Sequence, residues 1–388
     1  MQKHNQSPGW DHEKLKGYIF QFLTFGIVSL VIYYLYHNTQ QNLSAQNIAS
    51  GFGFLKQEAG FEIADSVLDY SSYDTYLKAL FIGLLSTLKV AVVGNILAIL
   101  LGIFVGICSR SSNWLVAKIS RTYIEVIRNI PLLLQLFFWY AVFTDILPSV
   151  REAKSFLPYT FLTNRGLYYP KFAQHSVWPW VWGATFVAIV GCLLLRRWSL
   201  KKMERDAVEV KVLPWSALVL IGLPLLTWLI GGAPTELTLP ELGGFNFRGG
   251  GVLTPEFTSL LLGLVLYTGA FNAEIVRSGI ESVSKGQWEA SRALGLSSSQ
   301  TLNLVILPQS LRVVIPPLTS QILNLTKNSS LAVAIGYSDF VAVANTTMNQ
   351  TGQAIEAVAL IMVVYLFFSL STSLFMNWYN KRVALVER

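Results

Sequence analysis

Long apolar stretches divide this chain of 388 residues, and each is close to the length that a helix needs to cross a lipid bilayer. A transmembrane helix takes about 20 apolar residues. The candidate spans are about 18–36, 84–107, 124–146, 177–195, 212–230, 258–277, 313–336 and 357–375. Within the hydrocarbon layer every backbone polar group must be bonded inside the protein, which a helix achieves alone. The sequence therefore predicts an all-α integral membrane protein with about eight transmembrane helices.

The composition supports this class and argues against nucleic-acid binding. Hydrophobic residues make up 53% of the chain and charged residues only 13%, whereas soluble domains carry about 25% charged residues. The net charge is +7, but the basic residues are spread among short loops between the spans. Orientation in a bilayer explains this distribution better than phosphate binding does.

The sequence contains no recognisable catalytic or metal-binding pattern. The two cysteines, Cys108 and Cys192, lie at or inside apolar segments, and the four histidines have no ligand spacing. No Gly-x-x-x-x-Gly-Lys-Ser/Thr loop is present, so the chain has no P-loop for ATP. We expect no catalytic residue, no metal site and no cofactor bound by this chain.

The distribution of basic residues predicts that the N-terminus is cytosolic. With that orientation, the inner segments hold Lys14 and Lys16, a run of five basic residues within 196–205, and Lys381 and Arg382. The outer segment 37–78 is mainly acidic, and 337–356 has no Lys or Arg, as the positive-inside rule requires. One outer segment, 148–176, violates the rule with Arg151, Lys154, Arg165 and Lys171. The segments 42–60 and 231–252 have the composition of exposed loops.

The seventh span is unusually polar. Ser320, Asn324 and Lys327 fall on one helical face, with Gln321, Thr326 and Asn328 close by. Polar groups at membrane depth are costly unless they face other helices or water. The cluster favours a polar passage, while hydrogen bonding between helices is the alternative for any single residue. Pro316-Pro317 is expected to break or kink the helix near its cytosolic end.

Three further groups stand out within the apolar stretches. Lys89 interrupts the second span, and snorkelling towards an interface is the preferred interpretation. Glu274 and Arg277 are spaced i,i+3, which predicts a structural ion pair. Pro131 is expected near a helix entry, and Gln135 is a candidate for facing the passage.

A charged segment between the sixth and seventh spans has the pattern of a helix, a turn and a second helix. Ser284 and Gln287 have the spacing of a capping box, and Gly295 can take the left-handed conformation that ends a helix. Ser297 and Gln300 repeat the capping spacing and predict the second helix. On the cytosolic surface this segment is either a docking element or an ordinary amphipathic connector.

The segment resembles the EAA loop of ABC-importer permeases, which reads Glu-Ala-Ala, three residues, Gly, nine residues, Ile-x-Leu-Pro. Here Glu289-Ala290-Ser291 precedes Gly295, and Val305-Ile306-Leu307-Pro308 follows. Ser291 replaces the second alanine, and Val305 replaces the isoleucine. The segments 128–135, 272–280, 315–321 and 325–331 are similar to those of polar-amino-acid ABC permeases. The resemblance covers 75–380, interrupted by 148–256, and the extra helices resemble the long permeases of general L-amino-acid uptake systems.

The resemblance implies a type I ABC importer in a bacterial inner membrane. Its implied partners are a second permease, a cytosolic ATPase dimer that holds ATP and Mg, and a periplasmic amino-acid-binding protein that delivers an L-amino acid. The coupling helix is expected at about 287–294, and the implied ATPase-coupling residues are Trp288, Glu289, Ala290, Ser291, Arg292 and Gly295. The substrate-pathway candidates are Gln135, Gln321, Asn324, Thr326, Lys327 and Asn328.

The expected organisation follows from the spans and the resemblance. An N-terminal helix and periplasmic loop are expected at 1–74. The permease core has two parts, 75–147 and 257–380, and the second contains the coupling loop at 281–312. Between them lies a two-helix insert with loops at 148–256, and a cytosolic tail follows at 381–388. An ion-coupled secondary amino-acid transporter is the alternative function. It leaves the EAA-like loop unexplained.

Overall fold

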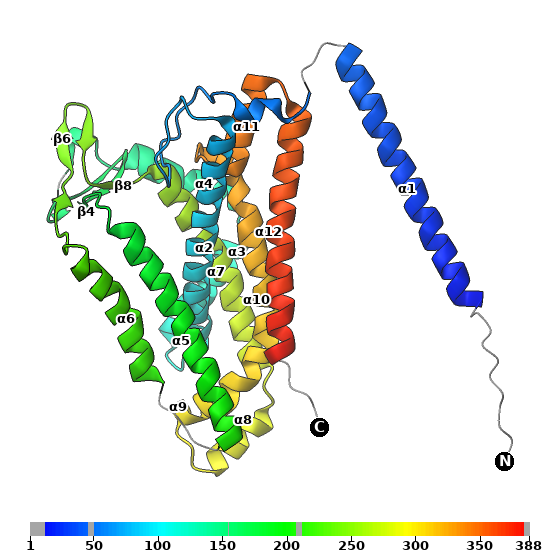
Figure 1. Ribbon diagram of the computed structural model, residues 1–388. Helices are drawn as coiled ribbons and strands as arrows, with labels where there is room; N and C mark the ends of the chain where they lie inside the picture. The colour runs from blue at the N-terminus through cyan, green and yellow to red at the C-terminus, as the bar shows by residue number, and fades with distance from the viewer. Residues whose placement is uncertain (1–11, 46–49, 154, 207–211, 384–388) are drawn as a thin grey trace. The chain divides into compact units, whose positions relative to one another are not determined.

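The computed structural model describes residues 12–45, 50–153, 155–206 and 212–383, and most of these residues are helical (Figure 1). The α-helices are α1 (His12–Ala45), α2 (Tyr76–Cys108), α3 (Trp114–Asn129), α4 (Leu132–Ala141), α5 (Trp178–Asp206), α6 (Leu213–Ile230), α7 (Pro255–Glu281), α8 (Lys285–Ala293), α9 (Ser298–Gln300), α10 (Leu307–Asn328), α11 (Phe340–Thr351) and α12 (Ala354–Val383). Shorter 3-10 and π segments are η1 (Phe52–Lys56), η2 (Val142–Ile146), η3 (Val150–Glu152), η4 (Thr301–Ile306) and η5 (Ser329–Ile335).

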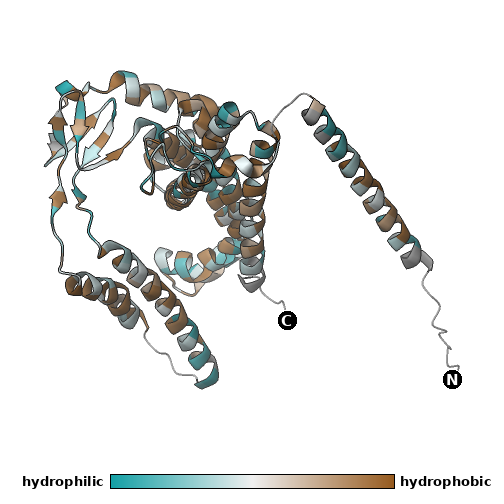
Figure 2. Cartoon of the chain, turned by 45° about the horizontal axis from the view of Figure 1, so that its top comes forward, coloured by the Kyte–Doolittle hydropathy of each residue, from teal (hydrophilic) through white to brown (hydrophobic). Residues whose placement is uncertain are grey.

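Seven of the predicted spans are confirmed as helices that are long and apolar enough to cross a membrane. Among the described residues these are Lys16–Thr39, Tyr76–Cys108, Trp178–Met203, Leu213–Ile230, Pro255–Glu281, Ser298–Ile335 and Ala354–Tyr379. Figure 2 shows apolar residues along most of the length of these helices. The chain is a multi-pass membrane protein.

The predicted span 124–146 is not one straight helix. Helices α3 and α4, with η2, meet at a bend of 104° and make an eighth span only if the pair is counted as one. Ile130, between them, is extended, because Pro131 disfavours helical backbone in the residue before it and has no N–H. Pro131 lies at the entry of α4, as expected: its carbonyl accepts from the backbone N–H of Leu134 and Gln135.

Residue contacts divide the chain into two compact units, 1–136 with 260–388, and 137–259. In the first unit α2 carries buried small residues at every fourth position, Gly94, Ala98, Gly102 and Gly106. The last two lie closely against α7. A β-carbon on Gly102 would lie 2.3 Å from the Cβ of Asn272, and one on Gly106 would lie 2.8 Å from the carbonyl oxygen of Ala273. Small residues let two membrane helices approach this closely.

The segment before α2 packs into the first unit instead of forming a fully exposed loop. Within the described part of 42–60, Phe54 and Ala59 are 2% and 1% exposed and belong to a cluster with Phe340 and Val343 of α11. The same segment supplies a partner for Lys89: its ammonium lies 3.3 Å from the Asp65 carboxylate. Lys89 therefore forms an ion pair with a residue outside its helix, which is compatible with the snorkelling interpretation.

The second unit contains short strands that the sequence analysis did not predict. The strands are β1 (Ser155–Leu157), β2 (Thr160–Thr163), β3 (Gly166–Tyr169), β4 (Lys171–Phe172), β5 (Leu237–Thr238), β6 (Glu241–Gly243), β7 (Asn246–Arg248) and β8 (Gly251–Leu253). They form an antiparallel sheet in the order β1-β2-β3-β8 and two ribbons, β4-β5 and β6-β7. The expected loops at 148–176 and 231–252 are thus a small β platform. The same unit contains α5 and α6, the two expected insert helices.

The polar seventh span continues through its proline pair. Pro316 and Pro317 lie inside α10, so the helix does not break there, and of the two expected outcomes only a kink stays a prediction. The helix ends at Asn328 and continues as η5 to Ile335, where Gly336 adopts a φ of 78°.

Candidate functional site

The EAA-like segment forms α8, α9 and η4, which connect α7 to α10 in the first unit. Figure 1 shows α8 and α9 at the end of this unit opposite α11. Helix α8 covers Lys285–Ala293, close to the expected coupling helix at 287–294. The apolar cluster beneath it contains Val276, Ile280, Val283, Ile306 and Val314, with Trp288 packed against it. The loop is therefore anchored to the ends of both spans.

The first predicted capping box does not form. Ser284 is the N-cap of α8 but makes no side-chain capping bond. The side chain of Gln287 instead accepts a hydrogen bond from the Gln309 amide at 3.1 Å. This bond joins the start of α8 to the start of α10.

The glycine and the second capping box behave as the sequence predicts. Gly295 has a φ of 73°, and the N–H of Leu296 donates to the Ser291 carbonyl, which closes a Schellman-type turn. Ser297 and Gln300 form a complete capping box with bonds of 3.3 and 2.9 Å. The direction of the chain after α8 is thus fixed by backbone geometry.

The predicted coupling residues divide into an exposed set and an anchoring set. Glu289, Ala290, Arg292 and Gly295 are exposed, and Leu294 beside them is 79% exposed. Trp288 is half-buried, and Ser291 is 2% exposed with its hydroxyl bonded to the Gln287 carbonyl at 2.7 Å. The serine that departs from the motif therefore lies on the inner side and leaves the outer surface of α8 unchanged.

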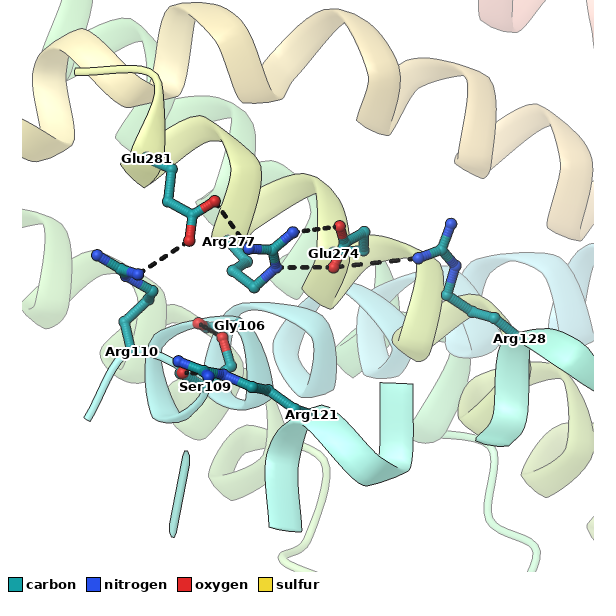
Figure 3. Close-up of polar contacts among 8 residues, drawn as sticks. All are labelled: Gly106, Ser109, Arg110, Arg121, Arg128, Glu274, Arg277 and Glu281. Carbon is teal, nitrogen blue, oxygen red and sulfur yellow. Dashed lines mark hydrogen bonds and ion pairs between the residues drawn. The ribbon is translucent and has the colours of Figure 1, made fainter. Parts of the chain in front are cut away.

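A chain of alternating charges runs along one face of α7 towards this loop (Figure 3). Arg277 bonds Glu274 at 2.6 Å and Glu281 at 2.7 Å, so the predicted 274–277 pair is confirmed. Arg110, just after α2, reaches Glu281 at 2.9 Å, and Arg128 of α3 approaches Glu274 at 4.0 Å. The five charges join the ends of α2, α3 and α7 immediately before α8.

Sequence analysis did not predict the glutamate partners of the outer members of this chain, Arg110 and Arg128. Each lies at the end of a different helix, more than 140 residues from its glutamate partner. Their only signal was their position at the ends of apolar stretches. Arg110 and Glu281 also line an open cavity of about 860 Å³ beside α8, together with Lys285, Glu289 and Arg292.

The polar residues of α10 separate into two groups. Asn324 and Lys327 are exposed on the same face as Ser320, and Gln321 and Asn328 are half-buried beside them. Thr326 faces a neighbouring helix, where the amide of Asn95 lies 3.5 Å from its hydroxyl. Hydrogen bonding between helices therefore applies to Thr326, whereas a polar passage stays a prediction for the exposed residues.

Gln135 is only 5% exposed and is bound at the break between α3 and α4. Its amide nitrogen donates to the carbonyls of Ile127 and Ile130, at 2.9 and 3.0 Å. In this position it stabilises the bend.

Comparison with known families agrees with the EAA-like geometry. Residues 98–213 and 210–385 match the family described as "Binding-protein-dependent transport system inner membrane component". The chain belongs to this family. The prediction of an ABC permease is thereby confirmed, and the secondary-transporter alternative is not retained.

Relatives of this permease align over nearly its whole length. It is 49% identical to the "General L-amino acid transport system permease protein AapQ" of Rhizobium johnstonii, over 97% of this chain and 94% of that protein. It is 48% identical to the "Putative amino-acid ABC transporter permease protein YhdX" of Escherichia coli, over 96% and 95%. It is 38% identical to the "Glutamate/glutamine/aspartate/asparagine transport system permease protein BztB" of Rhodobacter capsulatus, over 95% of each.

Proposed function

We propose that the chain is the transmembrane permease subunit of an ATP-driven amino-acid importer, and that α8 couples it to a separate ATPase. The observation that carries this proposal is the geometry of α8. It is a short helix fixed to two spans by Trp288, and it exposes Glu289 and Arg292 before a glycine-terminated turn. A movement of a partner bound to these residues would pass directly into α7 and α10.

The proposed substrate is an L-amino acid. The relatives that align over 94% or more of their length carry amino-acid transport in their names. ATP and Mg would be held by the ATPase dimer, since the sequence has no P-loop.

A second permease subunit would complete the pathway. Asn324 and Lys327 are exposed on a helix that crosses the membrane, and a charged or amide side chain facing lipid is costly. A partner permease across this face would enclose a polar passage. Lys327 and the amide of Asn324 can then receive the carboxylate of an amino acid. Gln321 and Asn328 flank this position, while Gln135 and Thr326 have local structural bonds.

The proposed membrane is the bacterial inner membrane, with α8 and the N-terminus in the cytosol. Helix α7 has 27 residues, or about 40 Å at the rise of an α-helix. Its start therefore lies on the opposite side from α8. An amino-acid-binding protein would approach from that side.

The test is ATP hydrolysis in proteoliposomes that contain this chain co-expressed with its neighbouring genes. Hydrolysis is measured with and without the binding protein and a panel of L-amino acids. Stimulation by the loaded binding protein supports the importer and identifies the substrates. Uptake driven by an ion gradient with no associated ATPase would refute it.

Two substitutions at Gly295 test the role of α8 itself. A β-carbon there would have no atom within 4 Å, so only the backbone conformation is under test. Asn tolerates a positive φ, whereas a β-branched residue does not. We expect Gly295→Asn to retain ATPase co-purification and stimulation, and Gly295→Val to lose most of both while the chain stays monodisperse. If the two variants behave alike, the left-handed turn at Gly295 is not needed for coupling to the ATPase.

A further inference from the structure

The β platform of the second unit presents one large aromatic side chain to solvent. Phe245 lies in the turn between β6 and β7 and is 79% exposed. Gly244, beside it, has a φ of 74°, which permits the tight turn. Most of this ring is therefore not buried by the rest of the unit.

The turn is held in place by contacts from two other segments. The Arg165 guanidinium donates to the Phe245 carbonyl at 3.3 Å, and Arg151 lies over the Phe245 ring at 5.5 Å from its centroid. Asn246 accepts a hydrogen bond from the Tyr168 hydroxyl at 2.8 Å. The next residue, Phe247, stacks on Phe161 at 4.5 Å between centroids. Phe245 and the two arginines are therefore positioned before any partner binds.

The positive charge of this surface lies in the one outer segment that violates the positive-inside rule. Arg151 and Arg165 are both exposed, and they lie in the outer segment 148–176, where four basic residues accompany one acidic residue, Glu152. Strand β8 leads directly into the start of α7, and the predicted topology places the segment 148–176 on the outer side. Basic residues are disfavoured on that side, and a role in binding gives a reason for their presence.

We propose that Phe245, Arg151 and Arg165 form a docking surface for an acidic face of the amino-acid-binding protein. The inference rests on the proposed function, because the family description and the outer position together specify such a partner. Aromatic and arginine side chains dominate the binding energy of protein interfaces. The two arginines would also speed the encounter with an acidic partner.

The exposed arginines also allow a different occupant, the anionic headgroups of the outer leaflet. The binding protein is the better fit, because the turn is rigid and combines one aromatic ring with paired cations at a single point. If the binding protein is the occupant, the patch variants should weaken its binding even in neutral lipid. If anionic headgroups are the occupant, the variants should have an effect only when anionic lipid is present.

The experiment uses the assembled importer in nanodiscs of neutral lipid and measures the Kd of the loaded binding protein at low and high salt. The variants are Phe245→Ser and the double variant Arg151→Glu/Arg165→Glu. The matched control is Lys171→Glu, which changes an equally exposed basic residue of the same unit on β4. All four positions are exposed, so the fold of the unit should persist.

We expect Kd to rise at least tenfold in both patch variants and less than threefold in the control. The double charge reversal should also remove most of the salt dependence. Unchanged Kd values in the patch variants would overturn the proposal. An effect that appears only when anionic lipid is added would also overturn it, in favour of headgroup binding. If the unmodified importer does not bind the binding protein, the proposed function fails as well.

Discussion

The hydrogen bonds at the α3–α4 break illustrate how one side chain can stabilise a bend of 104°. In a continuous helix the Ile127 carbonyl would accept from the N–H of residue 131, but that residue is a proline. The Gln135 amide donates to this carbonyl at 2.9 Å in its place. Gln135 thus substitutes for the missing backbone donor.

Gln135→Leu should destabilise the protein by about 1–3 kcal/mol, because it leaves the carbonyls of Ile127 and Ile130 without the donor that they share. The measurement is the fraction of monodisperse protein after heating in detergent. The matched background is Pro131→Ala, which restores the backbone N–H. There the same substitution should have a much smaller effect. Equal losses in the two backgrounds would show that Gln135 acts elsewhere.

Asp339 is a second residue with an unusual environment, in the segment between the last two spans. It is fully buried and caps α11 by accepting from the Ala342 N–H at 2.8 Å. Burial raises the pKa of its carboxyl to about 7. A raised folded-state pKa means that stability is fully present below the usual pKa of an aspartate and is lost as pH rises through about 7.

We therefore expect thermal stability to fall between about pH 4 and about pH 7, and Asp339→Asn to flatten most of that slope. Asp74→Asn is the control, because a hydrogen bond from Lys78 lowers the pKa of Asp74, which keeps it ionised throughout this range. Melting curves at several pH values provide the measurement. A slope that persists in Asp339→Asn would assign the pH dependence to another group.

At the scale of elements, the contact between α2 and α7 depends on the absence of side chains. Gly102 lies where a β-carbon would overlap the Cβ of Asn272 at 2.3 Å and approach its backbone at 3.1 Å. Backbone atoms cannot move away as a flexible side chain can, so the two helices would have to separate. The ion pairs between Arg110, Glu281 and Arg277 bridge the same two helices at their ends.

Gly102→Ala should lower the thermal midpoint and the yield of folded protein, with a loss of about 1–3 kcal/mol from overpacking. Gly183→Ala in α5 is the control, since a β-carbon there meets no atom within 4 Å. That change should be neutral or slightly stabilising, because alanine favours helix over glycine. If both variants behave alike, the close contact is not important for stability.

At the scale of the whole molecule, the sequence predicts best what local composition determines. Apolar runs predicted eight spans, and seven of them are confirmed as single helices among the described residues, because bilayer thickness fixes helix length. Gly295 and the Ser297–Gln300 capping box predicted the turn after α8, since both act within a few residues. The exposed polar face of α10 followed from helical periodicity.

The remaining features depend on contacts between distant residues. Strand β3 pairs with β8 about 80 residues later, and each strand is too short for an alternating pattern to appear. Lys89 pairs with Asp65, which lies outside its helix. The break at Pro131 was underestimated because the apolar run continues on both sides of the proline. The sequence alone does not show which distant segment pairs with β3 or which residue pairs with Lys89.

For the whole molecule, the environment of the polar face of α10 decides whether a passage exists, and it can be measured directly. Asn324 is exposed there, whereas the exposed face of α12 is apolar, with Met362 67% exposed. The test places a single cysteine at either position after Cys108 and Cys192 are replaced by alanine. A water-soluble maleimide then reports access, because a thiol in lipid remains protonated and unreactive.

In the assembled importer we expect Asn324→Cys to react at least about tenfold faster than Met362→Cys, or to crosslink to the second permease, because both outcomes keep polar α10 residues out of lipid. Comparably slow labelling at the two positions, with no crosslink, would contradict a polar passage along α10. ATP should change the rate at Asn324→Cys and leave Met362→Cys unaffected, since only the passage opens and closes during transport. A rate that ATP does not change would show that this face is static.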